Sequence, residues 1–191
     1  MTDDKQAHDD LSYVRSVLHR AENTAESPAS IYFLWAAITF FGFAIIDVAP
    51  KQTGFYWMIA APLGGVLSAV LGHRAGRAKG HSSRREGVVH AMHWAGLMVG
   101  IVLMVPLLLT HVIAVDDFPR LILLVIALSY YTAGVHVDRR LIPVSFVLVG
   151  CYLLTVFVRD LPQLWTVTGA ILAASLAVAG LFAAARVRRD A

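Results

Sequence analysis

Six apolar stretches occupy most of this 191-residue chain. Each holds about 18–22 residues, and a helix of that length, rising 1.5 Å per residue, crosses a hydrocarbon core of roughly 30 Å. Together with the connections between them, these stretches cover about 155 residues, and the remaining residues are too few for a soluble domain, which usually needs more than about 50. The sequence therefore predicts an all-α integral membrane protein, built as a bundle of six transmembrane helices. The predicted spans are 31–48, 55–72, 88–109, 118–137, 141–158 and 164–185.

Positive charge is divided unequally between the two ends of these spans. If the N-terminus is cytoplasmic, 13 lysines and arginines fall inside and three outside, and the opposite orientation reverses that ratio. Because basic residues are retained on the cytoplasmic side, the pattern predicts an even number of spans with both termini inside. We expect a multi-pass protein of the cytoplasmic (inner) membrane of a bacterium. The three outer basic residues are Lys51, Arg120 and Arg159.

The segment before the first span, residues 1–30, carries a pattern of its own. Apolar residues recur there at spacings of three and four, which predicts an amphipathic helix over about 10–26 that ends before Pro28. We expect this cytoplasmic helix to lie in the membrane interface or against the bundle, or else to dock a partner protein. Its apolar face is Leu11, Val14, Leu18, Ala21 and Ala25.

Two further segments are predicted to lie in the cytoplasm. Residues 73–87 are rich in Gly, Ser and Arg and are predicted to be a mobile loop, and residues 186–191 form a basic tail. The domain organisation is then an N-terminal segment over 1–30, a transmembrane domain over 31–185, and that tail.

Four histidines are predicted near the inner ends of the spans, where ionisable groups are candidate functional residues. His90 and His93 share one face of the third span, and neutral imidazole is a good ligand for zinc, copper or haem iron. The set His73, His90, His93 and His136 is a candidate metal site, and His93 with His136 is the candidate pair of axial ligands for haem b. Simple tolerance of histidine near the interface and a proton relay are the two alternatives.

At the outer end, Asp47 closes the first span and Arg120 opens the fourth. Opposite charges at neighbouring helix ends predict an ion pair at the outer rim. This pair could pin the two helices together, or it could act as a gate or a substrate contact.

Catalytic signatures are missing from the chain. It has no His-Glu-x-x-His helix, no Gly-x-Ser-x-Gly elbow and no phosphate-binding Gly-rich loop. We therefore expect an accessory or regulatory membrane subunit that acts through its cytoplasmic face. The alternatives are a haem- or metal-binding redox protein and a small transporter or channel.

The expected partners follow from the same features. The lipid bilayer is one, and a protein bound at the cytoplasmic helix and the basic loop is another. Small residues spaced by four, such as Gly96 and Gly100, serve either internal packing or a homodimer interface. The net charge of +3 follows from topology and contact with anionic headgroups, so nucleic-acid binding is not expected.

Overall fold

The computed structural model describes residues 27–78 and 84–189, and within these ranges the chain is helical and contains no strand. The predicted all-α class is therefore confirmed. The predicted helix at 10–26 lies outside the described residues. The elements are α2 (Ala29–Val48), the short 3-10 helix η1 (Pro50–Gln52), α3 (Thr53–Ala78), α4 (Arg84–Leu109), α5 (Phe118–His136), α6 (Leu141–Phe157) and α7 (Leu164–Arg189).

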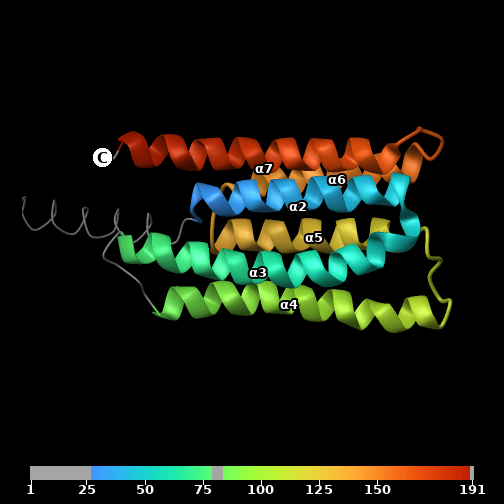
Figure 1. Ribbon diagram of the computed structural model, residues 1–191, viewed down its shortest axis with the longest axis horizontal. Helices are drawn as coiled ribbons and strands as arrows, with labels where there is room; N and C mark the ends of the chain where they lie inside the picture. The colour runs from blue at the N-terminus through green and yellow to red at the C-terminus, as the bar shows by residue number, and fades with distance from the viewer. Residues whose placement is uncertain (1–26, 79–83, 190–191) are drawn as a thin grey trace, which may run out of the picture.

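Consecutive helices run antiparallel along one axis, and the start of α2 lies at the same end of the bundle as the end of α7 (Figure 1). Five of the helices are long and apolar enough to cross a membrane, as a multi-pass membrane protein requires. The exception is α6, whose 17 residues span about 26 Å, near the lower limit for a transmembrane helix.

The predicted loop over 73–87 is wrong for most of its length. In the structure α3 continues to Ala78 and α4 already begins at Arg84. Arginine and alanine are good helix formers, and Arg77 in the last turn of α3 is favourable at the negative end of the helix dipole. The helices therefore extend beyond their apolar parts, and α7 likewise continues to Arg189.

The closest packing joins α2 to α7, the first and last described helices, and the next closest joins α5 to α6. Glycines permit the first contact: a Cβ added at Gly169 would lie 2.8 Å from the Cβ of Phe43, and one at Gly180 would lie 3.1 Å from that of Tyr32. By contrast, α3 and α4 have few buried residues. The small residues of α7 thus serve internal packing, whereas a Cβ at Gly96 or Gly100 on α4 would meet open space.

This difference gives a matched pair of substitutions. Gly169→Ala and Gly96→Ala bring the same gain in helix propensity, about 1 kcal/mol, but only Gly169→Ala forces α2 and α7 apart. We expect Gly169→Ala to be less stable than Gly96→Ala by about 1–3 kcal/mol, the usual effect of overpacking. Unfolding in mixed detergent–dodecyl sulfate micelles measures the difference. Equal stability of the two variants would mean that the α2–α7 contact is not close-packed.

Candidate functional site

The predicted histidine site is not assembled. His73 and His136 are exposed, and His90 is half-buried. Among the described residues, no three His, Cys, Asp or Glu side chains are grouped so that they could hold a metal ion.

His93 is engaged by α5. Its Nε2 lies 3.0 Å from the carbonyl oxygen of Ser129 and 3.2 Å from the hydroxyl of the same residue. A carbonyl oxygen only accepts hydrogen bonds, so the contact with the Ser129 carbonyl is a hydrogen bond in the tautomer whose Nε2 carries the proton. In this state Nε2 is neither a metal ligand nor a base for the Ser129 hydroxyl, although the distance suits a nucleophile–base pair.

The proposed haem pair is also displaced along the bundle axis. Ser129 marks the level of His93 on α5, and His136 follows Ser129 by seven residues, or about 10 Å of helix. Two axial ligands must face each other across one iron. His93 and His136 are therefore poorly placed to share a haem, and that part of the sequence-based hypothesis has no geometric support.

The predicted ion pair between Asp47 and Arg120 does not form, because each side chain bonds elsewhere. Asp47 Oδ2 accepts hydrogen bonds from the backbone N–H and the hydroxyl of Thr166, each at 2.7 Å. Thr166 is the third residue of α7, so Asp47 caps that helix across 119 positions of sequence. A carboxylate at a helix N-terminus is favoured by both the orphan N–H groups and the helix dipole.

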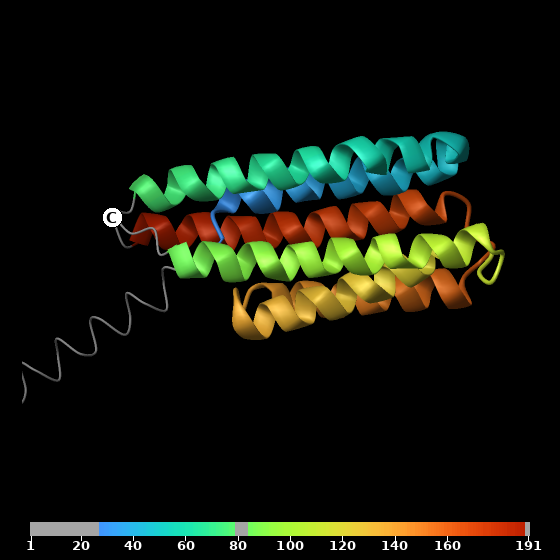
Figure 2. The same ribbon diagram turned by 90° about the horizontal axis from the view of Figure 1, so that it is seen from below.

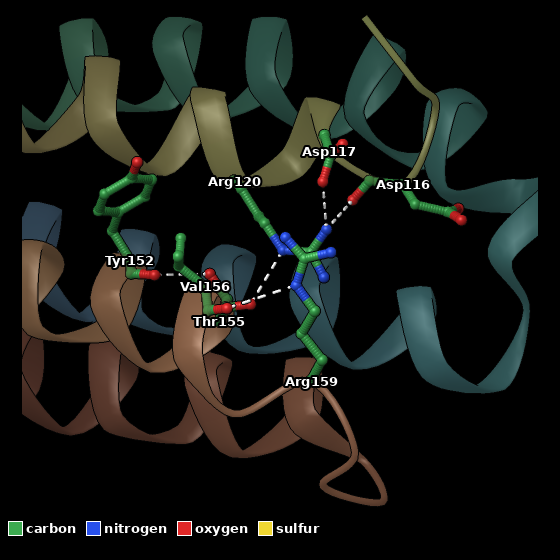
Figure 3. A network of polar contacts seen from close by, with 7 residues as sticks. All are labelled: Asp116, Asp117, Arg120, Tyr152, Thr155, Val156 and Arg159. Atoms are coloured by element: carbon green, nitrogen blue, oxygen red, sulfur yellow. Dashed lines mark hydrogen bonds and ion pairs between the residues drawn. The ribbon is translucent and has the colours of Figure 1, made fainter.

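Arg120 caps a different helix. Its Nε donates to the carbonyl of Thr155 at 3.0 Å, in the last turn of α6, and its Nη1 lies 2.6 Å from Asp117 Oδ1 (Figure 3). Nη1 also donates to the backbone carbonyl of Asp116, and Arg159 donates weakly to that of Val156. At this end of the bundle a carboxylate therefore caps the start of α7, and a guanidinium caps the end of α6.

The most buried carboxylate among the described residues is Asp138, which the sequence-based site hypothesis did not include. It lies in the short turn between α5 and α6 and is 2% exposed. Its Oδ2 accepts hydrogen bonds from the Tyr32 hydroxyl at 2.6 Å and from the Ser27 N–H at 3.1 Å. Its Oδ1 accepts from the Arg140 N–H at 3.1 Å. We call Ser27, Tyr32, Asp138 and Arg140 the Asp138 hub.

Two helix N-termini explain why a carboxylate can be buried at this position. Both α2 and α6 begin at the same end of the bundle (Figure 1), and Asp138 accepts a backbone N–H from just before each of them. These N–H groups lie at the positive ends of the two helix dipoles. The charge is therefore stabilised by directed N–H and O–H groups, and the first turn of α2 is fixed to the α5–α6 turn.

The sequence carried a local signal for half of this arrangement. An acidic residue three positions before an apolar run is a typical start of a helix, and Asp138 stands three residues before Leu141. Its contact with Tyr32 spans 106 positions and has no local signature. For that reason Asp138 is identified only once α2 and the α5–α6 turn are seen side by side.

Comparison with protein-family models, with curated proteins and with solved structures found no match to this chain.

Proposed function

We propose that this chain is a six-span protein of the cytoplasmic membrane that acts as an accessory or regulatory subunit through its cytoplasmic face. The observation that carries the proposal is the Asp138 hub. It fixes the backbone at Ser27, the point at which residues 1–26 join the described part of the chain. A fixed attachment point at Ser27 is compatible with an N-terminal segment that binds a partner protein.

The orientation is supported by where the basic residues lie. The ends of α3 and α7 carry the exposed residues Arg74, Arg77 and Arg186, and the α5–α6 turn at the same end carries Arg139. Under the positive-inside rule this end is cytoplasmic. With α6 counted as the sixth span, both termini then lie inside.

A partner-capture comparison tests this proposal. The full chain, tagged at its C-terminus and extracted in mild detergent from its own cells, is expected to retain a stoichiometric partner protein. Deleting residues 1–26 should reduce that recovery at least tenfold, because the deletion removes the segment that precedes the hub residue Ser27. Quantitative mass spectrometry of the purified material gives the ratio.

The control is a charge reversal at the opposite end, Lys51→Glu with Arg159→Glu, two exposed residues distant from the hub. It should leave partner recovery unchanged. Recovery that survives the deletion and is lost in the control would place the interaction at the outer end and would overturn the proposal.

A further inference from the structure

Two helices project past the start of α2 at the inner end. Gly72 of α3 lies beside Ile31 in the first turn of α2, and α3 continues for six more residues to Ala78. Gly180 of α7 lies beside Ala29, and α7 continues for nine more residues to Arg189. At 1.5 Å per residue, α3 and α7 extend about 9 and 13 Å beyond the start of α2.

The two views agree with this geometry. The inner ends of α3 and α7 reach farther than the start of α2 and the α5–α6 turn in both Figure 1 and Figure 2. Ser27 lies two residues before α2 and donates its N–H to Asp138 in the α5–α6 turn, at the end of the bundle from which α3 and α7 project (Figure 1).

The projecting ends are basic. Arg74 and Arg77 on α3 and Arg186 on α7 are all exposed, and Arg139 is exposed in the α5–α6 turn. We call these four residues the basic collar. Arginine at the last turns of α3 and α7 is compatible with the negative ends of their helix dipoles.

The segment that precedes Ser27 is acidic. Residues 1–26 hold six of the 13 acidic residues of the protein and only three of its 16 lysines and arginines. The acidic residues are Asp3, Asp4, Asp9, Asp10, Glu22 and Glu26.

We propose that the basic collar is a docking surface for the acidic N-terminal segment, residues 1–26, of the same chain. Two observations support this occupant: the charges are complementary, and Ser27 anchors the segment at the α5–α6 turn. Because it is tethered there, the segment reaches the collar at a high effective concentration. This inference rests on the proposed function and adds to it: a partner that takes the segment must first displace it from the collar.

Distance measurement between two spin labels tests the proposal on the protein alone. One label is attached at Ser16→Cys in the segment and the other at Ala185→Cys, an exposed position beside Arg186, with the buried Cys151 replaced by alanine. In nanodiscs of neutral phosphatidylcholine at about 50 mM salt, we expect a short and narrow distance distribution. At about 0.5 M salt, where screening acts within a few ångströms, it should broaden.

Charge reversal identifies the contact. The double variant Arg74→Glu with Arg77→Glu should broaden the distance distribution between the labels at low salt. Adding Asp9→Lys with Asp10→Lys to this variant should narrow the distribution again. Lys51→Glu with Arg159→Glu makes the same change of charge at the outer end and should have no effect.

Three outcomes would overturn the proposal. The first is a broad distance distribution in the parent protein at low salt, and the second is a narrow one that Arg74→Glu with Arg77→Glu leaves unchanged. The third is release of the segment in nanodiscs of phosphatidylglycerol, which would make anionic lipid the occupant of the collar. Each of these results leaves the partner-capture experiment to be judged separately, because a segment that does not dock can still bind a partner.

Discussion

Replacing Asp138 with alanine is expected to lower the free energy of unfolding by about 3–5 kcal/mol, the largest effect we predict. The substitution removes both carboxylate oxygens and leaves three donors without their acceptor: the Tyr32 hydroxyl and the N–H groups of Ser27 and Arg140. All three lie at the end of the bundle where α2 meets the α5–α6 turn. Titration with dodecyl sulfate in mixed micelles, followed by circular dichroism, measures the loss.

Two variants make this result specific to the hub. Tyr32→Phe removes one hydroxyl and keeps the carboxylate bonded to two N–H groups, so it should lose only about 1–2 kcal/mol. Asp160→Ala removes an exposed carboxylate at the opposite end of the bundle, and its free energy of unfolding should lie within about 0.5 kcal/mol of that of the parent. An Asp138→Ala protein as stable as Asp160→Ala would show that the hub does not hold these elements together.

Asp47→Ala is expected to have the second largest effect, a loss of about 2 kcal/mol. The N–H and hydroxyl of Thr166 lose their shared acceptor, and α7 loses a negative charge at the positive end of its dipole. Because α2 and α7 form the closest helix pair, the loss should appear in global unfolding rather than in local fraying. The same micelle titration measures it.

Asp47→Asn is the matched control for this prediction. Its side-chain oxygen can still accept a hydrogen bond from Thr166, so it should lose less than half as much as Asp47→Ala. If the two variants are equally destabilised, the negative charge matters and the hydrogen bonds do not. If neither is destabilised, Asp47 does not cap α7.

Sequence reasoning located the helices well because it rests on local patterns. The predicted span 118–137 corresponds to α5 at Phe118–His136, and 141–158 corresponds to α6 at Leu141–Phe157. Hydropathy does not mark where a helix ends once it has left the apolar layer. For this reason 73–87 was predicted as a loop, although α3 and α4 extend into it.

The candidate site was less predictable because its contacts join distant parts of the chain. Asp47 and Arg120 were predicted to pair because their charges are opposite, but each has a helix terminus as its partner. A helix end offers N–H or C=O groups that carry no formal charge and do not appear in a search for charged residues. The histidines were conspicuous in sequence, whereas Asp138 lies outside the predicted spans and has its hydroxyl partner 106 residues away.

The pairing of α2 with α7 also has a consequence for synthesis in the cell. Ribosomes add about 5–20 residues per second, so on the order of ten seconds pass between completion of α2 and completion of α7. During this interval the glycine-lined surface that later covers Tyr32 and Phe43 has not been made, and Asp47 has no helix to cap. A nascent chain arrested before Leu164 therefore contains α2 without its principal neighbour. The quality-control machinery of the cell would encounter such a chain as a helix that lacks its packing partner and carries an unpaired carboxylate.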